Sequence, residues 1–257
     1  MEPPKPVVWI ATTLSHFDHK GLSNDQAFAH LADHYRKPIE ELIRSAGGLP
    51  WDIQVVVRAG GSVARERCRF ATEFTVRDKS PDDILLMVDY DLMPTGQDYV
   101  SLLSRMSSGI DICGGIYTTR ENGGRWVLNP LSGARPTPSG LLPVMELGTG
   151  FKAFKLSVFQ RVLLKNPWLD CESEFDQRMR LLGFFSTGGV EDVKLWPGRR
   201  RWLTEDYWFD WLCRMSDIPT IADTRIKIRH WDEGDKVPYP AIFPDPPGQL
   251  PDEAQEL

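Results

Sequence analysis

Short apolar runs alternate with amphipathic segments along the first half of the chain. The apolar runs, which predict buried strands, occupy 6–13, 51–61, 82–91 and 110–119. Apolar residues recur instead at helical spacing in the segments between them, at 21–48, 62–74 and 96–108. This order favours an α/β fold with a mostly parallel central sheet flanked by helices.

Helical and strand patterns continue in the second half. The segment 155–165 has the spacing of an amphipathic helix. A second helix is expected from Thr204, an N-cap residue type, which is followed by Glu205 and Asp206 in the first turn, where the helix dipole favours negative charge. After this helix, alternating residues up to His230 predict a half-buried strand.

Composition and charge limit the class of protein. With 257 residues and 41% hydrophobic content, the chain can build a substantial core. Its four cysteines are widely spaced and form no CxxC pair, so neither a zinc knuckle nor a disulfide framework is indicated. The absence of an apolar run of about 20 residues, and of a signal peptide at the N-terminus, predicts a soluble cytoplasmic protein without a membrane partner.

The net charge of −6 comes from the C-terminal segment. Residues 231–257 hold seven acids and one lysine, and the rest of the chain is neutral overall. We therefore expect one domain over 1–232, with an acidic, proline-rich tail at 233–257. The neutral body leaves an anionic partner open.

The third apolar run ends in two carboxylates, in the sequence ILLMVDYDLMP at 84–94. In sheets of this kind, ligands bind beyond the carboxyl ends of the strands, where Asp89 and Asp91 stand. Residues two apart on a strand face the same way, so we expect both carboxylates to face one site. A pair of carboxylates repels unless a cation lies between them or one is protonated. Solvated loop acids are the alternative.

Three motifs together resemble a known family. ILLMVDYDLMP, LGTGFKAFKLSVFQRV and TEDYWFDWLCRMSDIPTIADTRIKIRHWD, in this order, are similar to the metal-dependent glycosyltransferases of the GT-A fold. The likeness is to the compact family 2-like enzymes common in bacteriophages and bacteria, and it covers most of 6–232. GGSVARERCRFATEF also resembles the family's "ARN" helix, with Glu66 where asparagine is frequent.

The resemblance implies transfer of a sugar from a nucleoside-diphosphate donor, with UDP favoured, to an acceptor hydroxyl. It implies a nucleotide-binding half at about 1–115 and an acceptor-binding half at 116–232. Asp91 would bind Mn²⁺ or Mg²⁺ directly, with His230 as a further protein ligand and Asp89 bridging to the metal or to the ribose. Asp206 would act as the general base of an inverting reaction, with Glu205 beside it.

The same resemblance suggests residues that bind the donor and the sugar. The nucleotide and donor candidates are Thr12, Thr13, Arg58, Arg65, Asp89 and Tyr90. The candidates for the sugar or acceptor pocket are Gly148, Thr149, Gly150 and Trp202. The glycines are expected to let the ligand approach the backbone closely. The alternative for Arg58 and Arg65 is that they are surface residues. The alternative for the glycines is that they form a tight turn before a helix.

The acceptor is not fixed by the sequence. Arg199, Arg200 and Arg201 lie beside tryptophans just before Asp206, a mixture that contacts phosphates and stacks on bases. Nucleic acid, such as a hydroxymethylated DNA base in a phage-infected or bacterial cell, is therefore one candidate, beside a glycan or a protein.

Other classes of protein fit the carboxylate pair less well. A haloacid dehalogenase-type phosphatase places its pair after the first strand, whereas two strands precede Asp89 here. A nucleotidyltransferase calls for a glycine-rich phosphate loop after strand one, and none follows 6–13. A non-catalytic sugar-binding module has no need of a base at Asp206.

Overall fold

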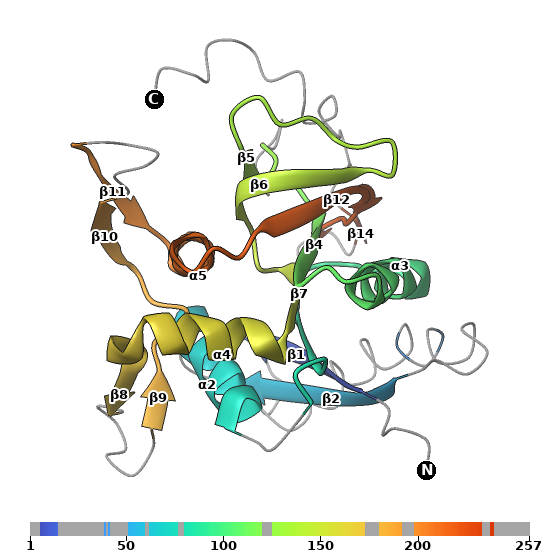
Figure 1. Ribbon diagram of the computed structural model, residues 1–257. Coiled ribbons are helices and arrows are strands. Elements are labelled where there is room, and N and C mark those ends of the chain that lie inside the picture. Colours follow the sequence, from blue (N-terminus) through green and yellow to red (C-terminus); the bar gives the residue numbers. More distant parts are fainter. Residues whose placement is uncertain are drawn as a thin grey trace.

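The computed structural model describes residues 6–14, 39, 41, 51–59, 62–76, 80–119, 125–172, 180–191, 198–232 and 237–238. Within these residues, one eight-stranded sheet has the order β2-β1-β3-β7-β4-β12-β6-β5 (Figure 1). Its strands are β1 (Val7–Leu14), β2 (Asp52–Ala59), β3 (Ile84–Asp89), β4 (Ile112–Ile116), β5 (Leu128–Pro130), β6 (Leu141–Leu147), β7 (Phe151–Lys155) and β12 (Thr220–Lys227).

Six strands of the sheet run in one direction. β1 is parallel to β2 and β3, and β12 is parallel to β4. β7 is antiparallel to both β3 and β4, so that β4 has the direction of β3. β6 is antiparallel to β12 and β5. Only β7 and β6 are therefore reversed within this sheet, so the predicted α/β fold is confirmed, with a mixed sheet in which three pairings are parallel and four antiparallel.

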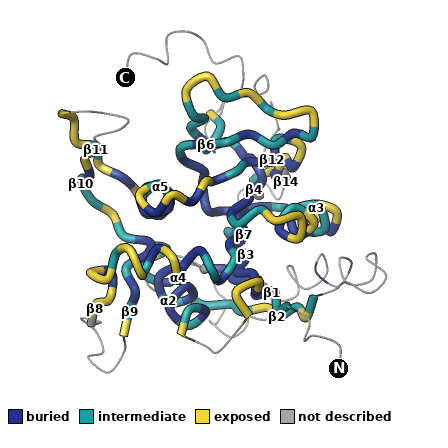
Figure 2. Tube along the Cα trace, in the orientation of Figure 1, coloured by how far each residue is buried: buried dark blue, intermediate teal, exposed yellow. Residues whose placement is uncertain are grey.

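Helices cover both faces of the sheet (Figure 1). α2 (Val63–Val76), α4 (Leu156–Lys165) and α5 (Glu205–Met215) pack into one apolar cluster, and α3 (Gly96–Ser107) packs into another. Alternate residues of β3 divide between the clusters: Leu85 and Met87 join the first, and Leu86 and Val88 the second. Burial on both faces explains why β3 is apolar throughout, and the inner strands are dark blue in Figure 2.

Smaller elements lie outside the main sheet. The pairs β8 (Asp170–Glu172) with β9 (Arg180–Leu182), β10 (Gly188–Glu191) with β11 (Arg200–Leu203), and β13 (Trp231–Asp232) with β14 (Val237–Pro238) are two-stranded sheets, and η1 (Pro167–Leu169) is a 3₁₀ turn. In Figure 1, β10 and β11 project as a hairpin beside α5.

The sequence pattern identified the elements of the first half, and it missed β6 and β7 of the main sheet as well as the short strands. The predicted strands at 6–13, 51–61, 82–91 and 110–119 correspond to β1, β2, β3 and β4, and the predicted helices at 62–74 and 96–108 to α2 and α3. The helix expected at 21–48, apart from Ile39 and Glu41, lies outside the described residues, as does nearly all of the acidic tail. No helix of the described ranges is long and apolar enough to cross a membrane.

Candidate active site

Strand β3 delivers its carboxylate to the edge of the sheet. The strand is buried through Val88 and ends at Asp89, whose amide donates to the carbonyl of Gly150 (N···O 2.8 Å). Tyr90 and Asp91 then form a turn, which the amide of Leu92 closes by donating to the carbonyl of Asp89 (3.1 Å). Asp89 thus lies at the carboxyl end of a buried strand, where α/β sheets bind ligands.

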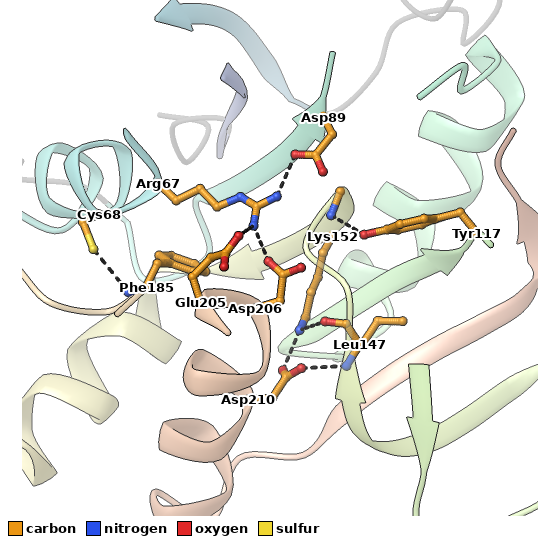
Figure 3. Close-up of polar contacts among 11 residues, drawn as sticks. Arg67, Cys68, Asp89, Tyr117, Leu147, Lys152, Phe185, Glu205, Asp206 and Asp210 are labelled. Carbon is orange, nitrogen blue, oxygen red and sulfur yellow. Dashed lines mark hydrogen bonds and ion pairs between the residues drawn. The ribbon is translucent and has the colours of Figure 1, made fainter. Parts of the chain in front are cut away.

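A buried arginine joins Asp89 to the start of α5. Arg67 extends from α2 with 3% of its side chain exposed. Its Nη2 donates to Asp89 Oδ1 (2.7 Å), while its Nη1 donates to Glu205 Oε1 (3.2 Å) and to Asp206 Oδ1 (Figure 3). One guanidinium therefore pairs with three carboxylates from two elements that are remote in sequence.

Charge and burial act together on this group. Burial lowers the pKa of Arg67, but the nearby Asp206, Asp89 and Glu205 outweigh it, so the pKa lies above its ordinary value and the guanidinium stays charged. Burial, and then repulsion from Asp206, raise the pKa of Glu205 above its ordinary 4.5, although Arg67 opposes the shift. Glu205 and Asp206 are therefore neighbouring acids in unequal environments.

The second carboxylate of the DYD sequence has a different partner. Leu92 and His230 form an isolated antiparallel bridge, and the amide of Met93 donates to the carbonyl of Arg229 (2.9 Å). This pairing holds the turn against the end of the segment after β12. Asp91 Oδ2 consequently lies 3.4 Å from His230 Nδ1, with about a tenth of each side chain exposed.

The two aspartates therefore do not converge on one cation as the strand argument predicted. β3 ends at Asp89, so the strand rule for residues two apart does not extend to Asp91. Among the described residues, no three His, Cys, Asp or Glu side chains form a group that could hold a metal ion. Asp91 and His230 are a carboxylate and an imidazole side by side, which suits a shared cation, but Asp89 is turned to Arg67 and does not fit as the third ligand.

A buried ion pair fixes α5 one turn below Asp206. Lys152 Nζ lies 2.5 Å from Asp210 Oδ1, and both side chains are fully buried. Asp210 also accepts from the amide of Leu147 (2.7 Å) and from the hydroxyl of Thr220 (2.9 Å). Burial raises the pKa of Asp210, while Lys152 and these donors oppose the shift. The start of α5 is thereby tied to the turn between β6 and β7 (Figure 3).

Thr204 stands at the N-cap position of α5, as predicted, but its side chain makes no capping hydrogen bond. Ser62 does cap α2, because its hydroxyl accepts from the amide of Arg65 (3.3 Å). Glu205 and Asp206 occupy the first turn of α5, where the predicted favourable dipole applies. Their contacts with Arg67 add a partner that the helix pattern did not contain.

The side chain of Tyr117 packs against the glycine turn at 148–150. The amide of Gly150 donates to the hydroxyl of Tyr117 (2.9 Å). A Cβ at Gly148 would lie 2.2 Å from that hydroxyl, and a Cβ at Gly150 would lie 2.7 Å from it and 2.8 Å from Asp89 Oδ2. Gly148, Thr149 and Gly150 are all buried, and Thr149 is fully so. The glycines accommodate Tyr117 and Asp89, which is a correction to the expectation that they admit a ligand to the backbone.

Tyr117 lies between the two halves of the site. Its ring contacts that of His230 edge to face, with the centroids 5.6 Å apart. Burial, followed by the charges of Asp206 and Asp89, raises the pKa of Tyr117 well above its ordinary value. The phenol is therefore neutral at physiological pH, and it packs the glycine turn against the His230 segment.

The predicted nucleotide residues are spread along β1, β2 and α2. Thr12 is buried, and within the described residues its hydroxyl has no hydrogen-bond partner. Arg58 pairs with Glu73, and its guanidinium lies 5.4 Å from the ring centroid of Phe70. Arg65 and Tyr90 are half-buried, while the side chain of Thr13 lies outside the described residues. Arg58 is thus engaged on α2 rather than directed toward Asp89.

The arginine run before α5 is divided between two roles. Arg201 donates to both carboxylate oxygens of the fully buried Glu146 (3.1 and 3.3 Å), which also accepts from Asn129 (2.6 Å). Arg199 and Arg200 are exposed, as is Trp202, with 74% of its surface accessible. Arg201 is a structural residue here, so the predicted set of three nucleic-acid contacts is reduced to Arg199 and Arg200.

Sequence reasoning missed Arg67, although a signal was present. Arg67 lies on the stripe of α2 that continues through Phe70, Ala71 and Phe74, which are all fully buried. An arginine at a core position of an amphipathic helix calls for a buried partner, because an unpaired buried charge is costly. The helix pattern thus predicts that Arg67 has a buried partner, but it does not identify Asp89 or Asp206 as that partner.

Comparisons with known proteins give little further guidance. No protein-family model matches the chain, and no curated protein matches it. Among solved structures, the chain is similar to the crystal structure of A197 from STIV, with 14% identity, 91% of this chain and 93% of that chain covered, and a TM-score of 0.46. It is also similar to a glycosyltransferase involved in the glycosylation of the major capsid of PBCV-1, with 13% identity, 63% and 66% coverage, and a TM-score of 0.31. At these scores neither likeness bears on the chemistry of the site.

Proposed function

We propose that the protein is a glycosyltransferase of the GT-A type, which moves a sugar from a nucleoside-diphosphate donor, with UDP favoured, to an acceptor hydroxyl. The observation that carries this proposal is the meeting of Asp89, at the carboxyl end of β3, with Asp206, at the start of α5, through one buried guanidinium. A strand end that binds a ligand and a carboxylate able to take a proton are the two parts that such a transfer needs.

In the proposed reaction, the acceptor oxygen attacks the anomeric carbon while Asp206 takes the hydroxyl proton. The bond from the anomeric carbon to the diphosphate oxygen breaks, and the nucleoside diphosphate leaves with the electron pair. Direct displacement of this kind inverts the anomeric carbon. Glu205, whose pKa is raised by burial and by Asp206, is the neighbouring group suited to hydrogen-bond an acceptor hydroxyl.

A divalent cation, Mn²⁺ or Mg²⁺, belongs to the proposal as a cofactor at Asp91 and His230. These are a hard oxygen and an imidazole, lying 3.4 Å apart on two backbone segments that pair with one another. When bound, such an ion would neutralise charge on the departing diphosphate. Asp89 is left out of this ligand set because it pairs with Arg67.

The acceptor side of the proposal rests on exposed groups of the β10–β11 hairpin. Trp202 offers an accessible ring on which either a carbohydrate or a base can stack. Arg199 and Arg200 are the exposed cations beside it. A glycan acceptor uses the ring alone, whereas a modified DNA base also needs the arginines for its phosphates, so these two residues separate the alternatives.

The first test measures thermal stability against nucleoside diphosphates and nucleotide sugars, each with and without Mn²⁺. A ligand that binds only the folded state raises stability by about 2.7 kcal/mol at a hundredfold excess over Kd. A shift with UDP compounds supports the donor assignment. Asp206→Asn should then keep the shift and stop transfer, and normal turnover of this variant would refute the base assignment.

No shift with any nucleotide would contradict the transferase proposal and favour a phosphatase or a non-catalytic sugar-binding module. Release of phosphate from a generic phosphomonoester, abolished by Asp89→Asn, would identify the phosphatase. Binding of free sugars without any turnover would identify the module.

A further inference from the structure

Arg67 contacts both the strand end at Asp89 and the helix start at Glu205 and Asp206. The guanidinium is planar, and it uses Nη2 for Asp89 on β3 and Nη1 for Glu205 and Asp206 on α5. Arg67 itself belongs to α2, so three elements meet at one side chain (Figure 3). A lysine carries a single ammonium on a flexible stem and lacks this fork.

The four side chains in this contact differ in their exposure to solvent. Only 3% of the Arg67 side chain is exposed, whereas 28% of Asp89, 23% of Glu205 and 18% of Asp206 are exposed. The guanidinium of Arg67 is thus buried, whereas the three carboxylates that it contacts are partly exposed to solvent. A ligand that enters the site contacts the carboxylates and not the guanidinium.

We infer that Arg67 is a positioning residue that holds Asp206 toward the strand end at Asp89, an assignment that rests on the proposed function. Since Arg67 is enclosed, it acts through the carboxylates rather than on the substrate. It opposes the mutual repulsion of three acids, and it aims one oxygen of Asp206 inward, which leaves the other oxygen to accept a proton. Asp89 accordingly holds Arg67 through its Oδ1 atom.

A structural test of this inference needs no substrate. In the wild-type background, Asp89→Asn and Asp206→Asn each break an ion pair and should lower the free energy of unfolding in urea. In an Arg67→Met background the same two substitutions each remove one of three neighbouring carboxylates that have lost the guanidinium between them, so they should become neutral or stabilising. Equal losses in both backgrounds would overturn the inference.

A functional test separates positioning from general stability. Arg105→Met is the matched control, because Arg105 pairs with the buried Asp223 (2.7 Å) on other elements. With a nucleotide sugar that passes the binding test, Arg67→Met should lower kcat at least tenfold while Arg105→Met leaves kcat unchanged. Arg67→Lys should recover part of the stability but not kcat, because one ammonium cannot join β3 to α5. If Arg67→Met does not fold, Arg67→Lys takes its place against the same control.

The outcomes distinguish the inference from the proposed function. Wild-type kcat in the Arg67 variant, with transfer otherwise present, would overturn the positioning role and leave the transferase intact. Absence of nucleotide binding and turnover in the wild-type protein would refute the transferase. In that case the urea experiment alone decides whether Arg67 couples the two carboxylate groups.

Discussion

Lys152 on β7 and Asp210 on α5 form an ion pair with no solvent exposure, at 2.5 Å between Nζ and Oδ1. Both partners make further hydrogen bonds, since Lys152 also donates to the carbonyl of Leu147 (3.1 Å) and Asp210 accepts from the amide of Leu147. Asp210 lies one helical turn after Asp206. The position of the proposed base therefore depends on a charge pair that takes no part in the reaction.

Lys152→Met should cost about 3–5 kcal/mol of stability, because it leaves the Asp210 carboxylate buried without its counter-charge. Urea unfolding measures this loss. Lys165→Met is the control: it removes an ion pair with Asp217 in which both side chains are largely exposed, so it should cost less than about 1 kcal/mol. Similar losses of stability for the two variants would show that the buried ion pair stabilises the fold no more than the exposed one does.

Adding a methyl group at Gly148 should destabilise the turn by about 1–3 kcal/mol, since its Cβ would overlap the Tyr117 hydroxyl. Tyr117→Phe removes that oxygen and loses one hydrogen bond, at about 1 kcal/mol. The double variant should therefore cost less than the sum of the single ones. Gly189→Ala, where the nearest atom is Arg200 Nη2 at 3.5 Å, is the tolerated control. Additive losses in the double variant would contradict this account.

Glu205 should make the protein less stable as the pH rises. Its folded-state pKa is raised by burial and by Asp206, so its contribution is fully present below the ordinary value of 4.5 and is lost as the pH rises through the folded value. Glu205→Gln removes this titration. The free energy of unfolding of Glu205→Gln in urea, relative to that of the wild type, should therefore be higher at pH 7 than at pH 4.

Glu191→Gln controls for loss of one charge, because Glu191 is exposed on β10. A Glu205→Gln curve parallel to the wild-type curve from pH 4 to pH 7 would contradict the raised pKa. Asp210, whose pKa is also raised, is present in both proteins.

The sequence predicts more of the fold than of the candidate site. The apolar run of β3 and the helical spacing of α2 are local patterns, and each sets the type of its own element. Burial on both faces then followed from an unbroken apolar strand. The short strands β5, β10 and β11 carry too few residues for either period to show, and they were missed.

The site depends on contacts that no local pattern encodes. Arg67 lies 22 residues from Asp89 and 138 residues from Glu205, so only the folded chain brings the three together. The acids Asp89, Asp91, Glu205 and Asp206 were recognised by their positions at element ends. A metal was expected between Asp89 and Asp91, because no basic residue is close to them in sequence, whereas the guanidinium of Arg67 pairs with Asp89 and also with Glu205 and Asp206.

The arginine run before α5 should separate into structural and exposed residues. Arg201→Ala should cost about 1–3 kcal/mol, since Glu146 is fully buried and loses a charged donor. Replacing Arg199 and Arg200 together with alanine should leave stability within about 0.5 kcal/mol. If DNA carries the acceptor, this double variant should lose retention on DNA at low salt. Unchanged transfer to DNA by the double variant would exclude those phosphate contacts.

Metal binding should distinguish the two aspartates of the DYD sequence. Asp91 lies beside His230, whereas Asp89 is held by Arg67. With Mn²⁺ as the only added ligand, Asp91→Asn should abolish the thermal shift, and Asp89→Asn should retain it at a lower starting stability. Both variants remove one negative charge from the same loop, so general electrostatic attraction weakens equally and the difference reports direct ligation. Equal loss in both variants would mean that Asp89 also ligates the ion, which would restore the three-residue metal site that the sequence resemblance implied and withdraw the reassignment of Asp89.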